Sequence, residues 1–480
     1  MDRDSSRAAV ESFVTSRVDR HTLGLVYGRR RIGKSTLLEA NAREHQGFYW
    51  EATRTEPAIQ LARLGEALGR HLGVGTLALS NWEEALRAVL RIPRSAPAPI
   101  VLDEFGHVLE ADKSVDSVIA TILGPGGAKP DGAPARLILC GSAIGLLGSL
   151  TAGEAPLRGR AGMELVMQPW DFRQAAQWLG SRPDLALATY VFAVIGGVVG
   201  YATDMVDHDL PADRDDFDRW IGTRLLSPAA TLHHEATTLL AEDPTLSARS
   251  PVIHHSILTA IANGDVSAGK IANQLRRSVS AIDPALKRLV DAGFVVRQED
   301  PIRAQRPLYT LADPFLQFHY AVLEPHGQLL RDRSPQTVWE RHLRKTFDSR
   351  VRGPVFEAQA RAWVRRFADE RTIGGLAVHS GPSAVVYGGV EHQLDVVIAA
   401  ANDEPPGQRD VLAIGEAKAG ETGSHAHLRA LERARAAIGT RAAHAKLLIF
   451  APDFTSEVRA ESDKRTDVEL IDLERLYYGE

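Results

Sequence analysis

The sequence has 480 residues, of which 44% are hydrophobic and 24% charged, proportions that are typical of soluble globular proteins and exclude a largely disordered chain. At about 100 to 200 residues per domain, this length predicts about three domains, each large enough to bury its own core. The formal net charge of −5 provides no overall positive field, so contact with nucleic acid would need local basic patches.

Cysteine content and hydropathy indicate the cellular compartment. The single cysteine, Cys140, excludes an internal disulfide framework and a cysteine-rich zinc site, which fits a reducing environment. The longest apolar stretch, from Tyr190 to Ala202, is too short and too rich in glycine for a membrane span. With no charged-then-apolar leader after Met1, we expect a cytoplasmic protein with no membrane partner.

A phosphate-binding loop is predicted near the N-terminus. An apolar run from Leu23 to Tyr27 leads into a glycine-rich segment and then into a helix-like pattern, the context that such a loop requires. Backbone N–H groups would surround the phosphates of ATP, Lys34 would contact the β- and γ-phosphates, and Ser35 would hold Mg²⁺. The predicted nucleotide-binding residues are Gly28, Arg29, Arg30, Arg31, Ile32, Gly33, Lys34, Ser35 and Thr36.

Two later apolar runs supply the residues that hydrolysis needs. The run PIVLDEF ends in Asp103, which can support Mg²⁺, and Glu104, which can act as general base toward the attacking water. A third run, RLILCGS, ends in Ser142, whose hydroxyl could contact the γ-phosphate or orient the water. Downstream, Arg158 and Arg160 are candidate arginine fingers, in cis or toward a neighbouring subunit, with solvated loop arginines as the open alternative.

These motifs resemble a known group of ATPases. GRRRIGKSTLL, VLDEF, LCGS and LRGR, in this order, are similar to the archaeal-type P-loop ATPases, relatives of the AAA+ and STAND ATPases. The resemblance implies a helical lid, a winged helix and a nuclease-like C-terminal domain after the ATPase core. The lid motif reads GGVVGYATDM, with Val199 where the family has proline, and LADPFLQFHYAVL has His319 where tryptophan is usual.

The middle of the chain independently predicts a winged helix-turn-helix. Three helical patterns are followed by two strand-like pieces around a loop from Pro301 to Pro307. In the third helix, Ile282, Leu286 and Leu289 would face inward and leave Lys287 and Arg288 outside. Basic residues outnumber acidic ones here, which favours contact with the DNA backbone, and a protein-protein adaptor remains the alternative.

Near the C-terminus, the strand-like run VLAIGEAKAG carries Glu416 and Lys418 on one side. An earlier strand-like run carries Asp395, and a helix before it carries Glu357 together with Arg361, Arg365 and Arg366, which could meet the DNA backbone. This order resembles the PD-(D/E)xK nuclease superfamily, with Leu394 in place of the proline. The resemblance implies that Glu357, Asp395 and Glu416 bind metal and that Asp395, Glu416 and Lys418 act in phosphodiester cleavage. The alternative is a weak surface ion pair.

The predicted fold class is α/β. We expect a P-loop ATPase core at 1–165, a helical lid at 166–245, a winged helix at 246–323 and an α/β restriction-endonuclease-like domain at 324–480. The predicted function is ATP binding and hydrolysis with Mg²⁺ in a protein that acts on DNA, in genome maintenance or defence, with a metal-dependent nuclease domain. The alternative is an ATP-gated signalling switch whose C-terminal domain is catalytically inactive. The sequence leaves homo-oligomer formation open.

Overall fold

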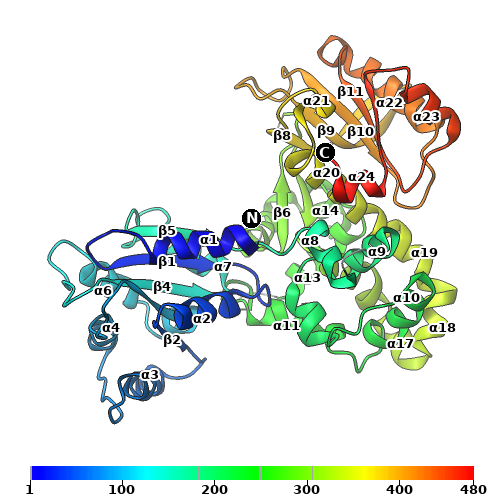
Figure 1. The fold of residues 1–480 in the computed structure, drawn as a ribbon. Helices are drawn as coiled ribbons and strands as arrows, with labels where there is room; N and C mark the ends of the chain where they lie inside the picture. The colour runs from blue at the N-terminus through cyan, green and yellow to red at the C-terminus, as the bar shows by residue number, and fades with distance from the viewer. Residues whose placement is uncertain (1–2, 181–182, 248–250, 305) are drawn as a thin grey trace.

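The computed structural model describes residues 3–180, 183–247, 251–304 and 306–480 (Figure 1). An N-terminal sheet and a C-terminal sheet lie apart from each other, and a largely helical middle region contacts both. This arrangement confirms the predicted α/β class, with a parallel-sheet core and a separate C-terminal sheet domain. No helix within the described ranges is long and apolar enough to cross a membrane.

The N-terminal sheet has five parallel strands in the order β2-β3-β4-β1-β5. Parallel neighbours need crossover connections, so helices cover the faces and the central strands read as continuous apolar runs. β3 and β4 are buried along their whole length. The strands are β1 (Thr22–Tyr27), β2 (Phe48–Glu51), β3 (Ala98–Asp103), β4 (Ala135–Gly141) and β5 (Ala161–Val166).

The helices around this sheet are mostly short. Their bounds are α1 (Arg3–Val14), α2 (Lys34–Glu44), α3 (Pro57–Leu72), α4 (Trp82–Leu90), α5 (Gly106–Ala111), α6 (Val115–Ile122) and α7 (Ile144–Ser149). Because the carboxyl ends of parallel strands meet at one edge, the segments after β1, β3 and β4 lie together there. The predicted strands before the loop, before Asp103 and before Ser142 are all present.

The middle region begins with the helices of the predicted lid and continues into a three-helix unit with a two-stranded antiparallel sheet. Ile282, Leu286 and Leu289 are buried, as predicted from their spacing. The elements are α8 (Phe172–Ala176), α9 (Leu185–Ile195), α10 (Arg214–Trp220), α11 (Thr231–Glu242), α12 (Pro244–Ser247), α13 (Pro251–Ala262), α14 (Ala268–Gln274), α15 (Val279–Asp291), β6 (Val295–Gln298) and β7 (Leu308–Leu311).

A helical connector follows the two-stranded sheet and returns to the lid. Trp339 is fully buried, lies edge-on against Phe217 of α10 and donates its indole N–H to Asp218 at 2.9 Å. The connector helices are α16 (Pro314–Phe318), α17 (Gly327–Asp332), α18 (Pro335–Val338) and α19 (Arg344–Phe347). Short π and 3-10 segments complete the region: η1 (Gln177–Leu179), η2 (Tyr201–Met205), η3 (Ile221–Leu225), η4 (His319–Leu323), η5 (Glu324–His326), η6 (Trp339–Leu343) and η7 (Asp348–Arg352).

The C-terminal sheet is mixed, in the order β12-β11-β10-β9-β8. β8, β9 and β10 are antiparallel neighbours, whereas β10, β11 and β12 run parallel. The elements are α20 (Gly353–Arg366), α21 (Glu370–Ile373), β8 (His379–Tyr387), β9 (Val390–Ala399), β10 (Val411–Ala417), α22 (His425–Ile438), η8 (Gly439–Ala442), β11 (Lys446–Phe450), α23 (Ser456–Ser462), β12 (Val468–Ile471) and α24 (Leu473–Tyr478).

Helices cover both faces of the C-terminal sheet. Leu428 and Leu431 of α22 share one core with Val397 and Ile414, and the opposite face packs against Trp363 of α20. This second core extends into the lid through Phe172 of α8, which meets Tyr477 of α24 edge-on. The lid segment therefore contacts the C-terminal domain directly, and the bounds of the four predicted domains stay a prediction.

Candidate nucleotide site and C-terminal carboxylate cluster

The segment between β1 and α2 turns tightly around its own backbone. Gly28, Arg31 and Gly33 all have positive φ, at 156°, 64° and 85°. A side chain at Gly28 would collide with the Met167 carbonyl, so only glycine fits there. Gly33 is the left-handed N-cap residue of α2, whose unsatisfied N–H groups and positive dipole end therefore face the loop.

The side chain of Lys34 is held inside this loop. It is buried, and its Nζ donates to the carbonyl oxygens of Gly28 and Arg29, at 2.9 Å each. Ile32 is fully buried and anchors the loop to the core, whereas Thr36 is exposed in the first turn of α2. The loop thus presents backbone N–H groups and one enclosed cation, the combination that binds phosphate.

Asp103 is fully buried at the end of β3, next to Ser35. Burial opposes its ionisation, yet hydrogen bonds from Cys140, Ser35 and Tyr49 hold the pKa of Asp103 below its ordinary value. The Tyr49 hydroxyl donates to Oδ2 at 2.7 Å. The Ser35 hydroxyl and an ionised Asp103 form a pair of hard oxygen donors, which fits Mg²⁺. Sequence reasoning missed Tyr49, because nothing in β2 marks its hydroxyl as a partner of Asp103.

Glu104 and Ser142 meet at the ends of the neighbouring strands β3 and β4. The Ser142 hydroxyl donates to Oε2 of Glu104 at 3.1 Å. Glu104 has a positive φ of 44°, a left-handed conformation that costs on the order of 1–3 kcal/mol for a residue with a side chain. The surrounding structure therefore forces the carboxylate into this position, beside the predicted γ-phosphate contact.

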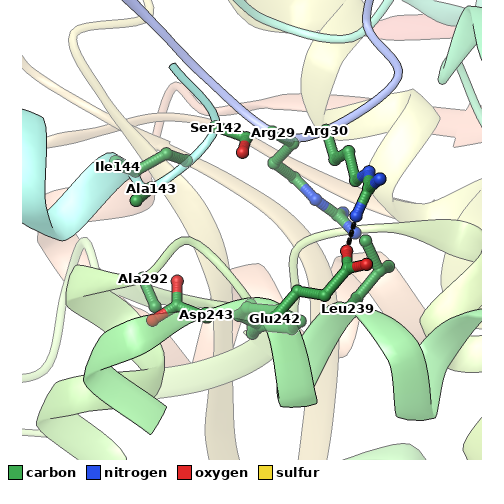
Figure 2. A pocket seen from close by; sticks show the side chains of 10 residues that line it. Arg29, Arg30, Ser142, Ala143, Ile144, Leu239, Glu242, Asp243 and Ala292 are labelled. Atoms are coloured by element: carbon green, nitrogen blue, oxygen red, sulfur yellow. Dashed lines mark ion pairs between the residues drawn. The ribbon is translucent and has the colours of Figure 1, made fainter. Parts of the chain in front are cut away.

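A cavity of about 50 Å³ lies beside these residues. Arg29, Arg30 and Ser142 line it from the N-terminal sheet, and Figure 2 shows both arginines extending toward α11. Opposite them, the lining residues come from α11 and its C-terminal end and from the segment between α15 and β6: Leu239, Glu242, Asp243, Ala292 and Phe294. The helical middle region therefore completes the wall of the candidate site.

The side chains of the three loop arginines are paired with acids of the middle region. Arg29 forms an ion pair with Asp313 at 2.8 Å, and Arg30 contacts Glu242. Arg31 donates to the buried Glu235 at 2.9 Å, and its Nη1 lies 3.7 Å from Asp204. These side chains already have partners. Contact between the nucleotide and the backbone N–H groups of the three arginines stays a prediction. Sequence reasoning did not single out these acids.

The candidate arginine fingers point elsewhere within this chain. Arg160 donates to the carbonyl of Ala120 at 2.5 Å, and Arg158 donates to the carbonyl of Gly153 at 2.7 Å. The structure therefore brings Glu104 and Ser142 together but gives Arg160 a partner at the end of α6. A role for Arg160 toward a neighbouring subunit stays a prediction.

The C-terminal carboxylates come together from three elements. Glu357 lies on α20, Asp395 on β9 and Glu416 on β10. Burial, followed by the nearby carboxylates of Glu357 and Glu416, raises the pKa of Asp395 to about 8. Burial also raises the pKa of Glu357, against the opposing effects of Arg361 and Lys418. The three acidic side chains therefore interact electrostatically within one cluster.

Each carboxylate of the cluster already has a partner. Lys418 lies 2.7 Å from Glu416, and Arg361 lies 3.7 Å from Glu357. Asp395 accepts a hydrogen bond from the backbone N–H of Ala417 at 2.8 Å. In the parts of the chain that the structure describes, no three or more histidine, cysteine, aspartate or glutamate side chains are arranged to hold a metal ion. The metal-ligand roles of Glu357, Asp395 and Glu416 therefore stay a prediction.

Arg361 corrects one expectation for this helix. The sequence suggested that Arg361, Arg365 and Arg366 could meet a DNA backbone. Arg361 is instead buried and donates to the Asp395 carbonyl at 2.9 Å, while Arg366 pairs with Asp171 of the lid at 3.0 Å. The physical reason is that a buried cation offsets the repulsion of the acidic cluster.

Comparisons with known proteins give distant likenesses. No protein-family model matches the chain. The uncharacterized protein MJECL04 of Methanocaldococcus jannaschii is 22% identical over 306 residues, which cover 63% of this chain and 64% of that relative, so the match spans just under two thirds of its length. The Walker-type ATPase PABY2304 of Pyrococcus abyssi has 19% identity, covers 67% of this chain and 96% of its own, and has a TM-score of 0.45.

A second solved structure is similarly remote. The ORC2 protein of Aeropyrum pernix has 18% identity, covers 69% of this chain and 94% of its own, and has a TM-score of 0.42. Such distant likenesses assign no activity to this chain, so the function is inferred from the residues of the two sites.

Lys34→Ala should abolish ATP binding, because it removes the cation that the loop holds through the carbonyls of Gly28 and Arg29. Binding of a fluorescent ATP analogue and ATP turnover measure the effect. Lys113→Ala, at an exposed position before α6, is the control and should behave as wild type. Unchanged turnover in Lys34→Ala would contradict the assignment of the loop.

Glu104→Gln should retain ATP binding and lower the hydrolysis rate by about 10²- to 10⁴-fold, because an amide cannot accept the proton of the attacking water. Single-turnover hydrolysis and a separate binding measurement distinguish the two effects. Glu110→Gln, on the adjacent helix α5, controls for loss of a carboxylate. Normal turnover in Glu104→Gln would show that another group is the base.

Asp395→Asn should raise the thermal midpoint at pH 8 without divalent cations. Folded Asp395 keeps its proton up to about pH 8, whereas its ordinary pKa is 3.8, so the folded state binds more protons between these values and stability falls as pH rises. The variant removes this titrating group, so its thermal midpoint should fall less steeply with rising pH. Thermal unfolding in EDTA from pH 5 to 8, with Asp403→Asn as an exposed control, checks it, and an unchanged slope would contradict it.

Proposed function

We propose that this protein is an ATPase that acts on DNA. The observation that supports this most strongly is the meeting of Lys34, the Ser35–Asp103 pair and the Glu104–Ser142 pair at one edge of a parallel sheet. This is the set of groups that ATP hydrolysis needs: a cation and N–H groups that bind the phosphates, oxygens that bind the metal, and a base with a hydroxyl beside it.

Each group has a defined task in the proposed hydrolysis. The loop N–H groups and Lys34 would bind the β- and γ-phosphates, and Ser35 and Asp103 would hold Mg²⁺, which would neutralise phosphate charge. Tyr49 keeps the Asp103 carboxylate ionised and oriented through its 2.7 Å hydrogen bond. Glu104 accepts the proton of the attacking water, while Ser142 orients its carboxylate at 3.1 Å.

The winged-helix unit supplies the proposed DNA contact. Its exposed cations cluster around α14 and the start and outer side of α15: Lys270, Arg276, Arg277 and Lys287. None of them has an ion-pair partner within the described residues, so their charges are available to phosphate groups. Arg288, predicted beside Lys287, is only half exposed, and Arg297 is paired with Glu299.

The C-terminal cluster is the proposed metal-dependent nuclease site. Glu357, Asp395 and Glu416 are hard oxygen donors whose mutual repulsion a divalent cation would relieve, and Lys418 would stabilise the negative charge that develops on the phosphate. Bound Mg²⁺ would supply the activation of water. Because Arg361 and Lys418 already neutralise two of the carboxylates, metal binding competes with these ion pairs.

One observation favours a second candidate, an ATP-gated switch with an inactive C-terminal domain. The loop between β6 and β7 packs on the C-terminal sheet, where Ser383 donates to Asp300 at 2.7 Å and Arg303 pairs with Glu391 at 2.9 Å. The wing therefore serves as a protein contact here, as an adaptor would.

ATP turnover with and without DNA distinguishes the two candidates. A DNA-acting ATPase should hydrolyse ATP faster when duplex or single-stranded DNA is present, whereas a switch should turn over slowly and at the same rate in both conditions. Mg²⁺- or Mn²⁺-dependent DNA cleavage that is lost in both Asp395→Ala and Lys418→Ala would support the nuclease. Absence of cleavage on every DNA form would favour the switch.

Lys287→Ala and Arg277→Ala should each weaken DNA binding and lower the slope of log affinity against log salt by up to about one unit. The reason is that DNA binding releases fewer counterions when the protein neutralises fewer phosphates. Fluorescence anisotropy at several salt concentrations measures the slope, with Lys113→Ala as the control. A wild-type slope in both variants would assign the winged helix to the adaptor class.

A further inference from the structure

Asp313 connects the winged-helix unit to the phosphate-binding loop. It follows β7 and is the N-cap of α16, where its Oδ1 accepts the N–H of Phe315 at 2.9 Å. Its Oδ2 lies 2.8 Å from Nη1 of Arg29, and the Tyr201 hydroxyl of the lid donates to the same oxygen at 3.4 Å. The Asp313 side chain is 1% exposed and that of Arg29 is 11% exposed.

We propose that Asp313 is a positioning residue for the ATP site, acting through Arg29. This inference rests on the ATPase function proposed above and names a residue outside the nucleotide loop on which that function depends. A buried carboxylate without its cation is strongly unfavourable, so Asp313 fixes the Arg29 side chain whenever α16 is docked.

The effect reaches the phosphates through one further contact. The backbone carbonyl of Arg29 accepts a hydrogen bond from Lys34 Nζ at 2.9 Å, and the carbonyl of Gly28 accepts another at the same distance. Holding the Arg29 side chain therefore also holds the carbonyl that aims the Lys34 cation. The path from Asp313 to Lys34 consists of one ion pair, one residue and one hydrogen bond.

The Arg29 side chain also contacts the winged-helix unit. Its guanidinium carbon lies 5.8 Å from the centre of the Phe294 ring, and Arg29 and Phe294 line the same cavity. Figure 2 shows the Arg29 side chain crossing from the loop toward the lid side of this cavity. Loop geometry and docking of the winged-helix unit therefore favour each other, and nucleotide binding must depend on both.

Asp313→Asn isolates the charge, because the amide oxygen can still cap α16 at Phe315. We expect at least a tenfold loss of affinity for a fluorescent ATP analogue in Asp313→Asn and in Arg29→Gln. The double variant should be no weaker than either single variant, because both remove the same ion pair. Asp204→Asn is the matched control: it removes an acid near Arg31 that is 59% exposed, and its affinity should stay within twofold of wild type.

The outcomes separate this inference from the ATPase assignment. Affinity losses that add in the double variant, or an Asp313→Asn affinity equal to that of Asp204→Asn, would overturn the positioning role while Lys34→Ala still reports on the ATPase. If Asp313→Asn does not fold, Arg29→Lys tests the same pair. It keeps the charge but loses the planar guanidinium, so a smaller loss of affinity than in Arg29→Gln supports the inference, and an equal or larger loss overturns it.

Discussion

The parallel registration of β1, β3 and β4 is the constraint on which the candidate ATP site depends. β1 and β4 pair residue by residue from Thr22 to Tyr27, and β3 pairs with the other side of β4. Strands that run in the same direction end at the same edge, so a loop, an acidic pair and a serine that are far apart in sequence become neighbours. The buried Asp103 is tolerated at this edge because hydrogen bonds replace its lost hydration.

Charge pairing then ties this edge to the rest of the molecule. Arg29, Arg30 and Arg31 each meet an acid of the lid or of the segment before α16. The pairs differ in their environment: that of Arg29 is buried, whereas Arg30 and Glu242 are both 43% exposed. Because solvent screens exposed pairs, the buried pair of Arg29 and Asp313 constrains the loop more strongly than the exposed pair of Arg30 and Glu242.

In the C-terminal domain, two cations partly neutralise a cluster of three carboxylates. Three carboxylates gather beside β9 and β10, and a buried arginine and a half-buried lysine offset their repulsion. The loop between β6 and β7 packs on the same domain through Asp300 and Arg303, so the unit that contains α13 to β7 contacts both the candidate ATP site and the C-terminal sheet.

The sequence by itself determined the local features of this protein. The glycine spacing from Gly28 to Gly33 predicts a tight loop before a helix, and apolar periodicity predicts the strands around it and the buried face of α15, because both depend on neighbouring residues. Only the tertiary structure decided which distant segments supply partners for polar and charged groups. The contacts of Tyr49 with Asp103, of Asp313 with Arg29 and of Arg361 with the Asp395 carbonyl carry no local signal, because they join segments that chain order does not place together.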